Sequence, residues 1–275
     1  MNTKNIGFIG AGNMATSLVS GLIASGHPAE FIWVADINQE SLETLAGRLQ
    51  VNIASSNSAL VEAVEVVVLA VKPQVLHSVA EQVASAIQRQ KSLVVSIAAG
   101  ITQSSLAQWL GSDVAIVRCM PNTPALVLTG ATALHANNKV TDVQRDLAEN
   151  ILRAVGLALW VDNEAELDAV TAVSGSGPAY YFLLMEAMEK AALALGLNEV
   201  QARLLIQQTA LGAAKIALES NESPAQLRQR VTSPGGTTEA ALACFEQGGF
   251  TQLVTQALQA AHDRSVTMSI ELGAR

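Results

Sequence analysis

Short apolar runs alternate with helix-length segments in the first part of the chain, from Ile6 to about Val161. Valine and isoleucine dominate these runs, and several are apolar at nearly every position, which is typical of strands buried on both faces of a parallel sheet. The predicted strands are Ile6–Ile9, Phe31–Ala35, Val66–Ala70, Leu93–Ile97, Ala115–Cys119, Ala131–His135 and Leu157–Val161. The predicted helices between them are Asn13–Ser25, Gln39–Leu49, Gln74–Ile87, Gln103–Leu110 and Asp142–Val155. This alternation predicts repeated βαβ units and a doubly wound, mainly parallel sheet of the α/β class.

Helix signals replace the strand pattern after Asp162. The pair Gly177-Pro178 resembles a helix start, and Ser223 with Gln226 forms a capping-box pattern. We therefore predict an α/β domain over residues 1–162 and an all-α domain over residues 163–275. Alanine- and leucine-rich helices such as Ala187–Leu195 have little polar surface. We expect a second copy of the chain to cover such faces.

Composition and charge mainly exclude functions. Half of the 275 residues (50%) are apolar, which is enough for a full core, and 16 basic against 24 acidic residues give a net charge of −8. Such a surface repels a phosphate backbone, and no apolar stretch approaches the roughly 18 residues of a membrane span. Because the strand pattern begins at Ile6, we expect no signal peptide. With only two cysteines, Cys119 and Cys244, we expect a cytoplasmic protein without a disulfide framework or metal site, binding neither nucleic acid nor membranes.

A glycine-rich fingerprint directly follows the first predicted strand. It consists of Gly10, Ala11, Gly12, Asn13, Met14 and Ala15, in the pattern G-x-G-x-x-A. The first glycine permits a tight turn, the second lets the backbone approach a pyrophosphate, and the small third position lets the helix lie close to the strand. The following helix start offers free N–H groups to phosphates. This strand, turn and helix predict a dinucleotide site.

Small residues and prolines follow several other predicted strands. They occur at Lys72-Pro73, at Ala98-Ala99-Gly100 and at Met120-Pro121-Asn122. In a doubly wound sheet, ligands bind beyond the carboxyl ends of the strands. These positions are therefore expected to let a nicotinamide and its ribose approach the backbone closely.

Asp36 follows the second predicted strand and has two interpretations. Its carboxylate can accept hydrogen bonds from the hydroxyl groups of the adenosine ribose, which favours NAD over NADP. Alternatively, Asp36 begins a turn and caps the next helix. The residue pattern leaves the choice of nicotinamide cofactor open.

Two glycine-rich segments interrupt the helical half, at Val173–Pro178 and at Ser233–Glu239. The second presents N–H groups, two hydroxyl groups and a helix start, which suit a small carboxylate, although a simple loop and cap fits equally well. Neither the scattered histidines nor the cysteines form a catalytic arrangement. A hydride transfer to an iminium ion needs little proton chemistry from the protein, because the cofactor carries the difficult step.

Five segments together resemble a known family. They are Phe8–Met14, Ala70–Pro73, Ser96–Gly100, Arg118–Pro124 and Ser233–Thr238. Over essentially its whole length the chain resembles pyrroline-5-carboxylate reductases, which catalyse the last step of proline synthesis. The resemblance implies an N-terminal Rossmann domain and a C-terminal helical domain that interlocks with a second copy to form a homodimer. It further implies a homodecamer of five dimers and the reduction of Δ1-pyrroline-5-carboxylate to L-proline with NADPH or NADH.

The resemblance also implies roles for individual residues. Gly10 to Ala15 would hold the pyrophosphate, with Asn57 near the adenosine ribose. The nicotinamide side would be lined by Ala70, Val71, Lys72, Pro73, Ala98, Ala99, Gly100, Met120, Pro121 and Asn122. The substrate carboxylate would bind the segment formed by Ser233, Pro234, Gly235, Gly236, Thr237 and Thr238, through its backbone N–H groups. Pro234 belongs to this segment but has no N–H group. Thr238 would offer its hydroxyl to the ring nitrogen, and Ser176 and Gly177 would border the pocket. Asp36 departs from family members with a small polar residue there, which puts strict NADPH preference in doubt.

Other functions remain as alternatives. A β-hydroxyacid dehydrogenase shares the glycine fingerprint but uses a lysine where this chain has Tyr181. A reductase of another cyclic imine differs only in the shape of its pocket. A nicotinamide-binding sensor without catalysis would not need the carboxylate receptor at Ser233–Thr238.

Overall fold

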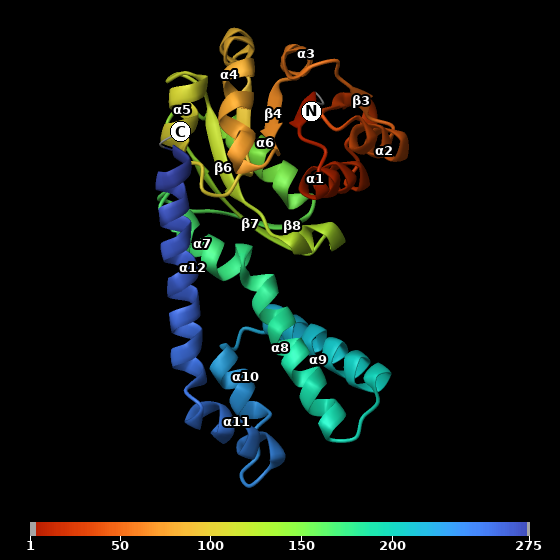
Figure 1. The fold of residues 1–275 in the computed structure, drawn as a ribbon, viewed down its shortest axis with the longest axis vertical. Helices are drawn as coiled ribbons and strands as arrows, with labels where there is room; N and C mark the ends of the chain where they lie inside the picture. The colour runs from red at the N-terminus through yellow and green to blue at the C-terminus, as the bar shows by residue number, and fades with distance from the viewer. Residues whose placement is uncertain (1–3, 274–275) are drawn as a thin grey trace. The chain divides into compact units, whose positions relative to one another are not determined.

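The computed structural model describes residues 4–273 and divides them into two compact units (Figure 1). The first unit comprises Met1–Pro178 together with Ala261–Arg275, and the second comprises Ala179–Ala260; their outermost residues 1–3 and 274–275 lie outside the described part. These compact units are a division by contacts, and the predicted boundary between residues 162 and 163 stays a prediction. Leu167 and Ala172, which follow that boundary, are buried.

The first unit is built on one eight-stranded sheet with the order β3-β2-β1-β4-β5-β6-β7-β8. The strands are β1 (Ile6–Ile9), β2 (Ile32–Ala35), β3 (Asn52–Ile53), β4 (Val66–Leu69), β5 (Leu93–Ser96), β6 (Ile116–Met120), β7 (Gly130–Ala136) and β8 (Gly156–Trp160). Neighbours pair in parallel except β6 and β7, which pair antiparallel. The predicted doubly wound, mainly parallel sheet is confirmed. The short β3 was not predicted, because its two residues form no apolar run.

Helices cover both faces of this sheet. They are α1 (Asn13–Ala24), α2 (Gln39–Leu49), α3 (Asn57–Ala63), α4 (Pro73–Gln90), α5 (Gln103–Leu110), α6 (Asp142–Arg153) and α7 (Glu166–Val170). Side chains alternate between faces along each strand. In β4, Val66 and Val68 join the core under α1, α2 and α6, whereas Val67 and Leu69 join the core under α3, α4 and α5. This double burial explains why the strand segments are apolar at nearly every position.

The helices of the second half are α8 (Gly177–Ala194), α9 (Glu199–Glu219), α10 (Pro224–Arg230), α11 (Thr237–Gln247) and α12 (Phe250–Gly273). The predicted capping box at Ser223 is confirmed, because the Ser223 side chain accepts the N–H of Gln226 while the Gln226 side chain accepts that of Ser223. Large apolar side chains such as Leu183 and Leu204 are more than half exposed. Among residues 4–273, no helix is long and apolar enough to cross a membrane.

Candidate active site

The glycine-rich turn has the geometry that the fingerprint predicts. Gly10 adopts a φ of +107°, and a Cβ atom there would lie 2.6 Å from the carbonyl oxygen of Ala70, so only glycine fits. At Gly12, by contrast, a Cβ atom would meet no protein atom within 4 Å. Helix α1 begins at Asn13 without a side-chain cap, and Ala15 is fully buried. Open space therefore lies against an uncapped helix start, as binding of a pyrophosphate requires.

Asp36 holds the glycine-rich turn from the end of β2. Its Oδ2 atom accepts a hydrogen bond from the N–H of Ala11 at 2.6 Å, and its Oδ1 atom accepts one from Asn38 at 2.8 Å. The cap of α2 is Asn38, whose side chain accepts the N–H of Ser41. Asp36 therefore begins a turn, as one of its two interpretations expects, but does not cap the helix. The half-buried carboxylate also places negative charge beside the turn.

The predicted nicotinamide-lining residues follow three adjacent strands. Ala70–Pro73 follows β4, Ala98–Gly100 follows β5, and Met120–Asn122 ends and follows β6. Because these strands are parallel, the three turns lie along one edge of the sheet. Asn57, at the start of α3, directs its side-chain amide to Gln82 Oε1 at 3.3 Å.

The predicted pocket-bordering residues Ser176 and Gly177 follow one turn of π-helix, Thr171–Gly175. This turn is tied to the end of β6. The Nδ2 atom of Asn122 lies 3.2 Å from both the carbonyl oxygen and the hydroxyl of Ser174, and a Cβ atom at Gly175 would lie 2.4 Å from Met120 Cε. The first unit thus brings Ser174 and Gly175, which directly precede Ser176 and Gly177, against the predicted nicotinamide-side turn Met120–Asn122.

The remaining predicted substrate residues, Ser233–Thr238, belong to the second unit. Within this segment the N–H of Gly235 donates to Glu239 Oε2 at 2.6 Å, and the N–H of Gly236 donates to the carbonyl oxygen of Ser233 at 3.0 Å. Helix α11 then begins at Thr237 without a side-chain cap. The N–H groups left for a carboxylate are therefore those at the helix start, including Thr237 and Thr238.

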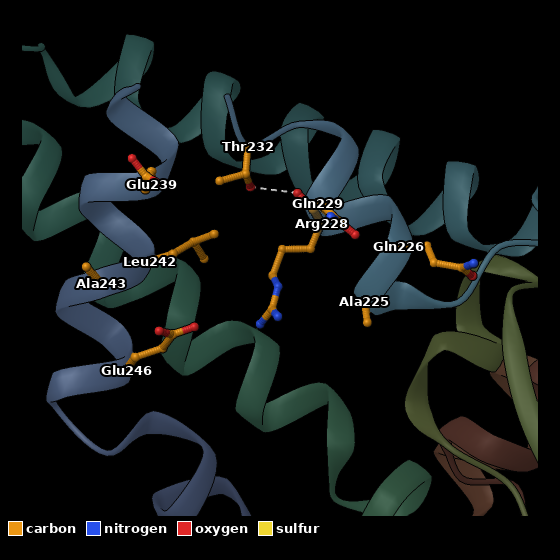
Figure 2. A pocket seen from close by; sticks show the side chains of 9 residues that line it. All are labelled: Ala225, Gln226, Arg228, Gln229, Thr232, Glu239, Leu242, Ala243 and Glu246. Carbon is orange, nitrogen blue, oxygen red and sulfur yellow. Dashed lines mark hydrogen bonds between the residues drawn. The ribbon is translucent and has the colours of Figure 1, made fainter. Parts of the chain in front are cut away.

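A hollow of about 410 Å³ lies between α10 and α11 of the second unit (Figure 2). Figure 2 shows the guanidinium of Arg228 extending into it, with Glu239 and Glu246 on α11. Its lining includes Thr232, just before the predicted carboxylate receptor, but not Thr238. No sequence pattern indicated this hollow, because its lining mixes polar and apolar residues that form no motif.

Sequence reasoning also missed a buried ion pair. Arg118, within the apolar β6, donates from Nη1 to Glu164 Oε1 at 2.9 Å. An arginine inside an apolar strand was the available signal. The neighbouring Cys119 is buried, which raises the pKa of its thiol far above the usual range and leaves it unreactive. Within residues 4–273 no cluster of three or more histidine, cysteine, aspartate and glutamate residues could hold a metal ion.

Family models match both halves of the chain. Residues 164–268 match the model described as pyrroline-5-carboxylate reductase dimerisation. Residues 5–100 match the model described as NADP oxidoreductase, coenzyme F420-dependent. The second match covers the glycine-rich turn, Asp36 and the turns after β4 and β5.

Curated relatives match over nearly the full length. The pyrroline-5-carboxylate reductase of Pseudomonas aeruginosa is 52% identical over 273 residues, which is 99% of this chain and 100% of the relative. The enzyme of that name from Escherichia coli is 40% identical over 268 residues, 97% of this chain and 98% of the relative.

Solved structures give the same relationship. The pyrroline-5-carboxylate reductase of Coxiella burnetii has a TM-score of 0.93 and 47% identity, covering 98% of this chain and 99% of that one. The Plasmodium falciparum pyrroline carboxylate reductase, solved with NADP bound, has a TM-score of 0.87 and 29% identity over 98% of this chain and 99% of that one.

Proposed function

This chain belongs to the pyrroline-5-carboxylate reductase family, and we propose that it reduces Δ1-pyrroline-5-carboxylate to L-proline with NADPH, and also with NADH. The observation that carries the proposal is the free space over Gly12, at an uncapped helix start beside three turns of small residues. The pyrroline-5-carboxylate reductases that align with this chain over almost their whole length, at 52% and 40% identity, support the same reaction.

The residues of the first unit fit a nicotinamide dinucleotide. Gly10–Ala15 would hold the pyrophosphate, since Gly12 leaves its backbone open and α1 presents its N–H groups. Asp36 and Asn57 would lie on the adenosine side, and the turns Ala70–Pro73, Ala98–Gly100 and Met120–Asn122 would line the nicotinamide. When bound, NADPH supplies the hydride that the imine carbon accepts. The Asp36 carboxylate disfavours a 2′-phosphate and leaves room for NADH.

The remaining task of the chain is to orient the substrate. The start of α11, with the N–H groups of Thr237 and Thr238, would bind the substrate carboxylate, and the Thr238 hydroxyl would hydrogen-bond the ring nitrogen. Ser176 and Gly177 would border the ring. A cyclic imine is appreciably protonated near neutral pH, so the imine carbon is electrophilic without a strong acid from the protein. Holding the reacting atoms about 3–3.5 Å apart is then the main contribution of the protein.

The helical half, which we assign to residues 163–275, would join two copies of the chain. The match to a dimerisation model and the exposed apolar side chains of α8 and α9 support a homodimer. The substrate site would then draw on both copies. The homodecamer of five dimers and the cytoplasmic location stay predictions.

Steady-state kinetics on the purified chain test the proposal. NADPH and NADH oxidation is followed with Δ1-pyrroline-5-carboxylate, with piperideine-6-carboxylate and without an imine, while the mass in solution is measured. We expect the five-membered imine to give the highest kcat/KM and proline to accumulate. A higher kcat/KM with the six-membered ring would assign the chain to another imine, and cofactor binding without turnover would indicate a sensor.

A further inference from the structure

An ion pair joins the buried Arg118 of β6 to Glu164, which lies between β8 and α7. The Arg118 side chain is only 5% exposed and that of Glu164 is 25% exposed. Removing a guanidinium from water costs several kcal/mol, and a well-packed apolar pair often stabilises a fold equally well. The pair therefore calls for an explanation beyond stability. Arg118 stands two residues before Met120, the first residue of a nicotinamide-lining turn.

One oxygen of Glu164 joins three segments of the first unit. Besides the Arg118 guanidinium on β6, Oε1 accepts the backbone N–H of Gln103 at 2.7 Å, at the first residue of α5. The Gln103 side chain continues this network, donating from Nε2 to the carbonyl oxygen of His135 at 2.8 Å. Gln103 follows Gly100 by three residues. The carboxylate therefore contacts α5 three residues after the Ala98–Gly100 turn and β6 two residues before the Met120–Asn122 turn.

The segment of residues 164–175 contacts the end of β6 a second time, through Ser174 and Gly175. Asn122 holds Ser174 through its side-chain amide, and its Oδ1 atom accepts the N–H of Ala131 at 2.9 Å. Gly175 lies so close to Met120 that a methyl group would not fit without movement. Residues 164–175 are thus anchored at both ends to the edge of the sheet, and Ser176 and Gly177 follow immediately.

We propose that Arg118 and Glu164 are positioning residues, which set the Ser174–Gly177 segment against the Met120–Asn122 turn and so fix where the imine meets the nicotinamide. This inference rests on the proposed function. In this role the two side chains act through the segments that they hold and not by contact with the reacting atoms. Because a misplacement of about 1 Å can lower a rate by about a hundredfold, loss of one anchor slows hydride transfer more than it weakens cofactor binding.

Glu164→Ala and Glu164→Gln in the full chain test the inference. Alanine removes both acceptor interactions, whereas glutamine keeps an oxygen for the Gln103 N–H and loses only the charge. We expect Glu164→Ala to lower kcat by about tenfold to a hundredfold. The kcat of Glu164→Gln should lie between those of the wild type and Glu164→Ala. The primary isotope effect on kcat, with NADPH deuterated at the transferred position, should rise in the same order. The NADPH dissociation constant, measured by fluorescence without substrate, should stay at the wild-type value.

Hydrogen exchange supplies a readout that does not depend on turnover. In Glu164→Ala, peptides that cover Ala98–Gln103 and Ser174–Gly177 should exchange faster, while those that cover Gly10–Ala15 should not change. Asp113→Asn is the matched control, since it breaks the exposed ion pair with Lys139 at 2.9 Å in the same unit. This control should keep the wild-type kcat and isotope effect.

The outcomes separate the two proposals. A wild-type chain that does not reduce the imine refutes the proposed function itself. An active wild type with a folded Glu164→Ala variant of unchanged kcat, isotope effect and exchange refutes the positioning role. If the alanine variant does not fold, the same three measurements on Glu164→Gln decide.

Discussion

Two glycines in one turn have different roles: the fold requires Gly10, whereas cofactor binding requires Gly12. Alanine substitutions at the two positions test this difference. A methyl group at Gly10 would lie 2.6 Å from the carbonyl oxygen of Ala70, on a residue whose φ is +107°. A methyl group at Gly12 would meet no protein atom, and the φ there is −74°. The first change therefore acts on the fold, and the second acts on the space that the cofactor would use.

We expect Gly10→Ala to lower stability and Gly12→Ala to lower cofactor affinity. A non-glycine residue in the conformation of Gly10 costs of order 1–3 kcal/mol, and forcing a methyl group into occupied space costs about 1–3 kcal/mol more. For a total of about 3 kcal/mol, Gly10→Ala should lower Tm by roughly 6–12 °C. At Gly12, alanine gains about 0.4–1 kcal/mol through the unfolded chain and loses a similar amount as a poorer helix cap, so Tm should change little. The same methyl group, pressed against a bound pyrophosphate, should weaken cofactor binding by roughly tenfold to a hundredfold.

Thermal unfolding without cofactor and fluorescence titration with NADPH measure the two effects on the same samples. The expected pattern is a large loss of Tm for Gly10→Ala, and a large loss of NADPH affinity with normal Tm for Gly12→Ala. Wild-type NADPH affinity in Gly12→Ala would show that the cofactor does not approach this turn, and would refute the reasoning.

Three further predictions concern single side chains. Thr238→Ala should lower kcat without abolishing turnover, because it removes an orienting hydroxyl and no unique proton donor; complete loss of activity in a folded variant that binds NADPH would contradict that role. Asp36→Ser should raise the ratio of kcat/KM for NADPH to that for NADH, since it removes a negative charge near the expected 2′-phosphate, and an unchanged ratio would place Asp36 away from the ribose. Burial lowers the pKa of His27 below its usual value of 6.5, against a backbone hydrogen bond with Lys4 that raises it. The unfolded chain then binds the proton more readily, so the free energy of unfolding should fall as the pH drops below about 6.5, and it should fall less in His27→Gln. If urea unfolding gave the wild type and the variant the same loss of unfolding free energy between pH 7 and pH 5, this would be contradicted.

The sequence predicted those features that depend on neighbouring residues. β1 and the starts of α1, α2, α5 and α6 lie where the apolar period and the turn residues placed them, because each depends on local pattern. The Gly10 turn was predictable for the same reason, since one residue type tolerates that φ. The family motifs then supplied roles that spacing alone left open.

Pairings between distant parts of the chain could not be predicted. Asp36 binds the N–H of Ala11, 25 residues earlier, and Glu164 reaches Arg118 across 46 residues. Nothing in the local sequence of either carboxylate specifies its partner, since sheet order and helix packing bring the two together. One local feature was missed as well, because the N–H groups of Gly235 and Gly236 bind Glu239 and Ser233 nearby in the chain and are not left free.

Deuterium transfer tests the central claim most directly. The full chain is incubated with Δ1-pyrroline-5-carboxylate and NADPH carrying deuterium at the transferred position of C4, and the proline formed is analysed by mass spectrometry and NMR. The account predicts one deuterium per molecule of proline, on the ring carbon that was the imine carbon. Oxidation of NADPH without labelled proline would contradict it.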